Sequence, residues 1–265
     1  MNSVSSINTL KLVLKVFLFS VVLLLSTNQK LIAQSNPKFE ILVLTERGGQ
    51  HGSFTDRALA WLNQTGNEEG FLITEINNTD KINQEYLSKF KVFIQLDYPP
   101  YNWTDVAKLA FEDYIENGKG GWIGFHHAGL LGEFDGFKMW NWFSDFLGGI
   151  RFKNYIAKTT SATIYLEDSK HPIMKNINPH FVIPNDEFYT FDKSPRAKVS
   201  VLANVDESSY EPSSDIKMGD HPVIWSNQKM KSRNVYFLFG HSGSIFASKD
   251  FTGMFKNAIH WAAYR

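Results

Sequence analysis

Four histidines of this 265-residue chain lie directly behind apolar segments, or one glycine-rich loop beyond them: His51, His126, His127 and His241. The imidazole ring titrates near neutral pH, so histidine is suited to moving protons and to binding metal ions. A single histidine behind a strand is usually a hydrogen-bonded structural group. Four of them in comparable places indicate a functional site to which several segments contribute.

The most informative stretch runs from Gly120 to Gly129 and reads Gly-Gly-Trp-Ile-Gly-Phe-His-His-Ala-Gly. Its first half is a short apolar run between glycines, which is typical of a buried central strand. Gly124-Phe125-His126-His127-Ala128 then has the spacing of a nucleophile elbow, with His126 at the position of the nucleophile. Histidine is not the usual nucleophile, so this position favours acid–base chemistry or metal binding. The alternative is a buried strand that ends in a helix-capping histidine.

Two further segments place polar groups near the same predicted edge of a sheet: Asp186-Glu187-Phe188-Tyr189 and Asp220-His221-Pro222. Acid–base catalysis needs a proton carrier and a group that orients or charges it. We expect four side chains to converge on one pocket: His126, Glu187, His221 and His241. The candidate catalytic residues are His126, His127, Glu187 and His241. The candidate substrate-binding residues are His51, Trp103, Asp186, Tyr189 and His221.

Other chemistries are less well supported by the residue types. The chain has no cysteine and no Gly-x-Ser-x-Gly segment, which disfavours thiol and serine nucleophiles. A glycosidase needs two acids at a defined separation, and the neighbours Asp186 and Glu187 do not usually face each other. A divalent metal held by the histidines with Asp186 or Glu187 stays possible, although no His-x-x-x-His spacing supports it.

Aromatic residues make up 15% of the chain, and many of them lie in polar segments. Such rings stack on sugars, although aromatic-rich cores and interfaces are as common. The loop Asp97-Tyr98-Pro99-Pro100-Tyr101-Asn102-Trp103 adds a carboxylate and three rings behind a predicted strand. Trp103, Tyr101 and Tyr189 are therefore candidate stacking platforms for a small-molecule sugar.

The elements that must position these residues alternate between strand and helix. Apolar runs predict strands at Phe39–Thr45, Phe71–Ile76, Lys91–Leu96 and Trp122–Phe125, separated by helices that begin near Thr55, Asn83 and Thr104. This order predicts a doubly wound, mostly parallel α/β sheet with helices on both faces. Ligands of such sheets bind beyond the carboxyl ends of the strands. Alternation over Lys158–Asp168 and later short strands predict an additional β-rich C-terminal part.

Residues 1–34 have the pattern of a signal peptide. Lys11 and Lys15 precede the apolar core Val16–Leu25, and a small-residue cleavage site follows near Ala33. The core is shorter than the roughly 20 residues of a membrane span. We therefore expect residues 35–265 to be a single α/β domain, periplasmic or secreted, with no stable membrane span after cleavage. A retained signal anchor is the alternative.

Charge gives no support for a nucleic-acid or anionic-membrane partner. The chain carries 27 basic and 27 acidic residues, and three of the basic ones, with no acidic one, lie in residues 1–34. The remainder thus has a net charge of −3, without the basic excess that such partners require.

The chain as a whole resembles the ThuA-like (trehalose-utilisation) family. The resemblance covers essentially all of residues 35–265. The motifs that carry it are Gly120 to Ala128, Asp186-Glu187-Phe188-Tyr189, Asp220 to Trp225, Arg233-Asn234-Val235-Tyr236 with Gly240-His241, and Ala258 to Ala262. The resemblance implies a fold similar to class I glutamine amidotransferases and flavodoxin-like domains. It also implies that His126 replaces the cysteine of the elbow, so glutamine hydrolysis is not implied. The family is linked to disaccharide uptake and breakdown, including routes through oxidised (keto) sugars.

Two functional hypotheses follow. The first is an exported enzyme that acts on a sugar by acid–base catalysis in a histidine and carboxylate pocket. The second is a sugar-binding module without turnover, and a metal-dependent hydrolase is a further alternative.

Overall fold

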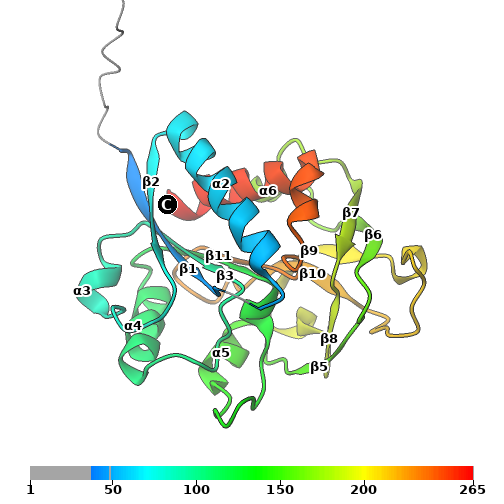
Figure 1. Cartoon of the computed structure of the whole chain (residues 1–265), viewed down its shortest axis with the longest axis horizontal. Coiled ribbons are helices and arrows are strands. Elements are labelled where there is room, and N and C mark those ends of the chain that lie inside the picture. The colour runs from blue at the N-terminus through cyan, green and yellow to red at the C-terminus, as the bar shows by residue number, and fades with distance from the viewer. Residues whose placement is uncertain (1–36, 48, 265) are drawn as a thin grey trace, which may run out of the picture. The chain divides into compact units, whose positions relative to one another are not determined.

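Nine strands form the central sheet, in the order β2-β1-β3-β4-β11-β10-β9-β6-β7 (Figure 1). The structure is a computed structural model that describes residues 37–47 and 49–264. Five neighbouring strands are parallel: β2 (Phe71–Ile76), β1 (Phe39–Thr45), β3 (Val92–Leu96), β4 (Gly121–Phe125) and β11 (Asn234–Phe237). The order of these five strands is that of a flavodoxin-like sheet, with β11 as the fifth strand.

The remaining four strands of the sheet run antiparallel to their neighbours. They are β10 (Pro222–Ser226), β9 (Ser200–Val205), β6 (Thr160–Leu166) and β7 (His180–Asp186). Because the directions alternate from β11 onward, β7 runs the same way as the parallel strands and ends at their carboxyl edge. A separate small sheet pairs β5 (Phe152–Tyr155) with β8 (Tyr189–Phe191). The α/β fold class predicted from the sequence is confirmed.

Helices cover both faces of the parallel half (Figure 1). One face carries α2 (Gly52–Glu69) and α6 (Lys249–Ala263), and the other carries α4 (Asp105–Glu116), with α3 (Gln84–Leu87) beside it, and α5 (Asn141–Phe146). Five short 3₁₀ helices complete the described elements: η1 (His126–Gly129), η2 (Pro172–Met174), η3 (Pro195–Ala197), η4 (Glu207–Ser209) and η5 (Gly243–Ala247).

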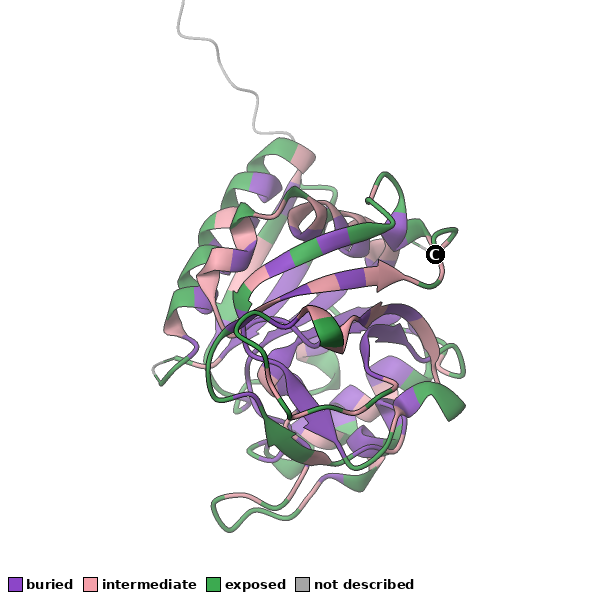
Figure 2. Cartoon of the chain, turned by 90° about the vertical axis from the view of Figure 1, so that its right-hand side faces the viewer, coloured by how far each residue is buried: buried purple, intermediate pink, exposed green. Residues whose placement is uncertain are grey.

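Strand β4 shows why both faces are covered. Its Trp122 ring lies 5.1 Å from the ring of Phe146 on α5, while its Phe125 ring lies 4.8 Å from the ring of Phe255 on α6. Side chains alternate along a strand, so apolar groups on both sides require a cover on both faces. By contrast, β6 and β7 carry alternating buried and more exposed residues (Figure 2), and the alternation in β6 is the one that the sequence predicted.

The predicted helix starts are right for α4 and wrong for α2. The Thr104 hydroxyl accepts the N–H of Ala107 and caps α4 as expected. Helix α2, however, begins at Gly52 rather than near Thr55, because the N–H of Thr55 already bonds the carbonyl of His51. His51 is therefore held at the start of α2, above the carboxyl edge of the sheet.

Residues from Pro37 onward form one compact unit. The predicted signal peptide, residues 1–34, lies outside the described residues, so it stays a prediction. Within the part of the chain that the structure describes, no helix is both long enough and apolar enough to cross a membrane.

The stability of the fold should depend on pH through His171. Its Nδ1 accepts the N–H of Ile173 at 3.3 Å, and burial lowers the pKa of His171 below its ordinary value, with Asp168 raising it and Arg233 lowering it. A base whose pKa is lower in the folded state adds stability above about pH 6.5, which is lost as the pH falls.

We therefore expect His171→Asn, which keeps a capping oxygen but does not titrate, to lose less stability than the wild type between pH 7.5 and pH 5.5. The ring is partly exposed, which keeps the difference below about 1 kcal/mol. Urea unfolding at both pH values measures it, and an equal loss in the two proteins would contradict this role.

Candidate functional site

Polar residues follow the strands at the carboxyl edge of the sheet. The residues directly behind strands β1, β3, β4 and β7 are Glu46, Asp97, His126 and Glu187. His241 follows β11 after Leu238, Phe239 and Gly240. Strands from distant parts of the sequence thus place polar side chains together at one edge, as a doubly wound sheet does.

The elbow expected from the sequence is present at His126. This residue has a φ of +38°, in the left-handed region that non-glycine residues rarely adopt, and the chain continues into η1. Such a conformation costs on the order of 1–3 kcal/mol. The Tyr236 hydroxyl donates to the His126 carbonyl at 2.7 Å and supports it. A Cβ on Gly240 would lie 3.0 Å from the His126 Cβ, so this approach needs a glycine.

The hydrogen bonds of His126 fix its tautomer. Its Nδ1 lies 2.9 Å from the carbonyl oxygen of Leu238, which can only accept, so Nδ1 carries the hydrogen. In the neutral ring, Nε2 then presents a lone pair, and it lies 3.3 Å from Oε2 of Glu187. His241 places its Nδ1 3.7 Å from the same oxygen. Burial lowers the pKa of His126 well below its ordinary value, lowers that of His241, and raises that of Glu187.

Glu46 orients two further histidines. Its Oε2 lies 2.8 Å from Nδ1 of His127 and 3.0 Å from Nδ1 of His51. Burial alone would raise the pKa of Glu46, but its hydrogen bonds to His127 and His51 lower it to about 2. Glu46 is therefore a carboxylate that accepts from both rings, and Nε2 of each histidine is left for other partners.

Asp97 is a fully buried carboxyl group next to the elbow. It has a φ of +54°, and its Oδ1 accepts the backbone N–H of His127 at 3.4 Å. Its Oδ2 has no partner among the described residues. Burial raises the pKa of Asp97 well above its ordinary value, and the nearby carboxylates act in the same direction.

Asp186 holds the backbone of the site. Its carboxyl group accepts the N–H groups of four residues at 2.8–3.3 Å: Glu187, Gly240, His241 and Ser242. Burial raises the pKa of Asp186 to about 7, while these four donors act in the opposite direction. The sequence assigned Asp186 to substrate binding, but the structure assigns it to the turn that carries His241.

An open pocket of about 300 Å³ lies beside these groups, lined by Glu46, Gln50, His51, His127, Leu130, Phe152, Tyr155, Glu187 and Tyr189. Its lining combines titratable groups with aromatic rings. The Tyr189 ring lies 4.1 Å from that of His126 and 5.0 Å from that of Phe152. A lining of polar groups and aromatic rings suits a ligand that has both hydroxyl groups and an apolar face.

The structure brings together most of the residues that the sequence singled out, namely His51, His126, His127, Glu187, Tyr189 and His241. His221 does not join them. Its Nε2 bonds the carbonyl of Tyr189 at 2.9 Å, and its Nδ1 faces Glu207 at 2.9 Å and the Tyr210 hydroxyl at 3.1 Å. Both nitrogens are therefore engaged behind Tyr189, and His221 supports the pocket wall instead of facing a substrate.

Trp103 is also placed elsewhere. Its side chain is buried among core rings, 5.8 Å from Phe93, 5.3 Å from Phe111 and 5.3 Å from Trp140 between centroids. Its ring faces the core, so the assignment of Trp103 as a stacking platform is corrected. Tyr101 likewise packs against Phe134 and is not among the residues that line the pocket.

Sequence reasoning did not assign Glu46 or Asp97 to the site. Both are the first residue behind a predicted strand, and this position was the available signal. The loop from Asp97 to Trp103 was expected to add a carboxylate at this edge, without a role for it.

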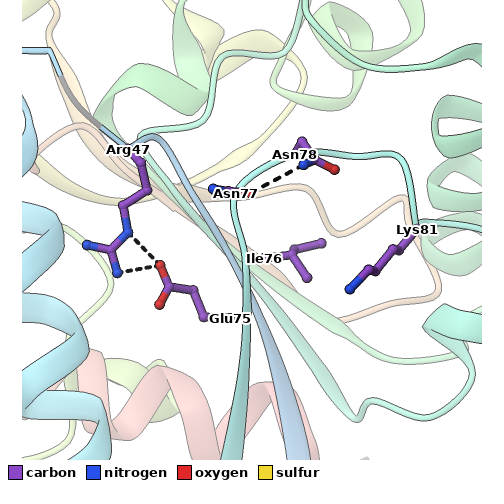
Figure 3. A pocket seen from close by; sticks show the side chains of 6 residues that line it. All are labelled: Arg47, Glu75, Ile76, Asn77, Asn78 and Lys81. Carbon is purple, nitrogen blue, oxygen red and sulfur yellow. Dashed lines mark hydrogen bonds and ion pairs between the residues drawn. The ribbon is translucent and has the colours of Figure 1, made fainter.

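A second pocket, of about 360 Å³, lies beyond the end of β2 (Figure 3). Its lining is Arg47, Glu75, Ile76, Asn77, Asn78 and Lys81. Arg47 donates from Nε to Glu75 at 2.7 Å and from Nη1 to Asp56 at 3.0 Å, so its charge is already compensated. This pocket has none of the histidines of the site.

Two groups of side chains have the proximity that metal ligands need. The ligand atoms of His51, His126 and His241 all lie within 4.8 Å of one another. The same holds for Glu46, His51 and His127, but there the histidine Nδ1 atoms already bond to Glu46.

Comparison with known proteins adds a family to this geometry. A family model described as ThuA, trehalose utilisation, matches residues 40–262. The chain is similar to a ThuA-like protein from Bacteroides uniformis, with 29% identity, a TM-score of 0.76, and coverage of 86% of this chain and 92% of that one. A ThuA-like protein from Parabacteroides merdae shows 16% identity, a TM-score of 0.65 and coverage of 86% and 90%.

The fold is also similar to that of the glutaminase domain of a Trypanosoma brucei CTPS, with 10% identity and a TM-score of 0.53. The match covers 86% of this chain and 96% of that domain. No curated protein matches the chain.

Proposed function

The chain belongs to the ThuA (trehalose utilisation) family, and from this premise we propose that it catalyses proton transfer on a disaccharide or a keto derivative of one. Family membership makes a sugar-related role plausible. The reaction and the type of sugar are part of the proposal, and they rest on the chemistry of the pocket.

One observation carries the proposal: Glu187 Oε2 lies 3.3 Å from His126 Nε2 and 3.7 Å from His241 Nδ1, at the edge of an open pocket. A carboxylate between two imidazole rings can accept a proton and return it through a neighbour. In a keto sugar, the C–H next to the ketone is the acidic bond, so Glu187 takes that proton. His127, oriented by Glu46, then faces the substrate oxygens.

Proton exchange in D₂O tests the proposal. We expect the purified protein to exchange hydrogen for deuterium next to the ketone of oxidised disaccharides, or to convert them, at rates above those of buffer alone. NMR and mass spectrometry measure both, with trehalose and other unoxidised disaccharides in parallel. If the pocket bound these sugars and left every one unchanged, a sugar-binding module would replace catalysis. The aromatic residues Phe152, Tyr155 and Tyr189 in the pocket lining favour this alternative.

Export belongs to the same proposal and rests on the sequence of residues 1–34 alone. We expect mature protein from the periplasm or the medium to begin near Gln34 or Ser35, as measured by its intact mass. Exported protein that still begins at Met1 would contradict cleavage.

A further inference from the structure

Two buried nitrogens of the site have no hydrogen-bond partner among the described residues: Nε2 of His126 and Nδ1 of His241. His126 is fully buried, and the side chain of His241 is 15% exposed. Leaving a buried polar atom without a partner costs about 1–3 kcal/mol. Two such atoms directed at one carboxylate therefore point to a missing partner between them.

A proton or a metal ion fits the gap between these atoms. His126 donates its only hydrogen, on Nδ1, to Leu238, so a lone pair on Nε2 faces a lone pair on Glu187 Oε2 across 3.3 Å. These two atoms repel each other unless a positive charge lies between them. A proton shared by Glu187 and His126 would relieve this pair, but it would leave Nδ1 of His241, 3.7 Å away, without a partner. A metal ion would satisfy Glu187, His126 and His241 together.

We propose that His51, His126 and His241 bind one divalent transition-metal ion, with Oε2 of Glu187 as the fourth protein ligand and the other carboxylate oxygen left as the base. Metal–ligand bonds of about 2.0–2.1 Å place tetrahedral ligand atoms about 3.3 Å apart. The two distances from Glu187 Oε2, 3.3 Å and 3.7 Å, are close to this spacing. The three histidine ligand atoms, all within 4.8 Å of one another, reach it by small side-chain movements.

The groups behind the ligands are those that orient metal-binding histidines. His126 donates Nδ1–H to the carbonyl of Leu238, and His51 donates Nδ1–H to the carboxylate of Glu46. Such bonds select the tautomer whose other nitrogen faces the metal. Asp186 holds the N–H of His241 and so fixes the third ligand.

The donor set indicates the class of metal. Three imidazole nitrogens and one carboxylate suit zinc, cobalt, nickel or iron(II) better than magnesium or calcium, which prefer oxygen ligands. An ion with five or six ligands would keep positions open for adjacent oxygens of a sugar. At these open positions the bound ion would polarise the ketone of the sugar. This catalytic role rests on the proposed function. Metal binding itself does not depend on that function.

Metal loading of the full-length protein tests the site. After chelation and dialysis, we expect the protein to take up one equivalent of Zn²⁺ or Co²⁺, measured by elemental mass spectrometry and competition with a chromophoric chelator. The absorption of bound Co²⁺ should indicate nitrogen and oxygen ligands. His51→Ala or His126→Ala should weaken binding more than 100-fold, and Glu46→Gln, which removes only an orienting group, by about 10- to 100-fold.

A matched control is His260→Ala, because Nε2 of His260 lies 3.4 Å from Glu69 in a histidine–carboxylate pair on the surface. This variant should keep one equivalent of metal. Circular dichroism establishes whether each variant is folded. If an alanine variant unfolds, Glu46→Gln, which keeps the side-chain shape, tests the site in its place. The proposal would be overturned if the wild type took up no Zn²⁺ or Co²⁺. It would also be overturned if folded His51→Ala and Glu46→Gln bound the metal as tightly as the wild type does. Metal uptake without turnover would instead count against the proposed function alone.

Discussion

Glu187→Gln should lower turnover by about 10²- to 10⁴-fold and leave the fold intact, because Glu187 is the carboxylate between the two imidazole rings. Glutamine has the same shape but cannot accept a proton at neutral pH. The contact with the backbone should survive, because the N–H of Glu187, rather than its side chain, bonds Asp186. Values of kcat and KM on the sugar that the exchange assay identifies, together with the thermal midpoint, measure the effect.

The same substitution at Glu69 is the matched control, since Glu69 pairs with His260 and Lys256 on the surface. Glu69→Gln should change neither turnover nor thermal midpoint appreciably. If Glu187→Gln kept turnover within about threefold of the wild type, Glu187 would not be the base. If its thermal midpoint fell as steeply as its activity, its role would be structural.

Asp186→Ala should destabilise the fold by about 3–5 kcal/mol, the range found when one partner of a buried charged group is removed. The substitution leaves the N–H groups of four residues without their acceptor, on two chain segments that no local element joins. His241 would lose its fixed backbone, so metal binding and turnover should fall as well.

Asp186→Asn should lose less stability than Asp186→Ala. Oδ1 of Asp186 accepts from Glu187, Gly240 and His241, and only the bond from Ser242 goes to Oδ2. The amide oxygen of asparagine can keep the first three bonds, so we expect a loss of about 1–2 kcal/mol. Urea unfolding measures both variants against Asp250→Ala, which removes an exposed carboxylate bonded to Asn178. An Asp186→Ala loss no larger than that of Asp250→Ala would contradict the proposed role.

The fold followed from local patterns, and for that reason most of it could be predicted. The apolar runs of β1, β3 and β4, separated by helix signals such as the Thr104 cap, need no long-range information to be recognised. The place of β11 between β4 and β10 did need it. Nothing in a four-residue apolar strand states which two neighbours it pairs with.

The site could be predicted where position behind a strand was enough, as for His126 and His241. It could not be predicted where the role depends on partners that tertiary structure supplies. Asp186 meets N–H groups 54 to 56 residues further along the chain, and His221 meets a carbonyl 32 residues before it. An aromatic ring in a polar loop, such as Trp103, gives no sign in the sequence that core rings enclose it.

The place of β11 also sets the order in which the protein is completed during synthesis. Among the strands, β11 is the last to be made, yet it lies in the middle of the sheet, hydrogen-bonded to β4 and β10. A nascent chain that ends before Asn234 presents two unpaired strand edges, which favour association with other chains. It also lacks His241 and the Leu238 carbonyl that orients His126. The chemistry of the pocket is therefore acquired late, when residues 234–241 close the sheet and supply His241, with η5 and α6 still to follow.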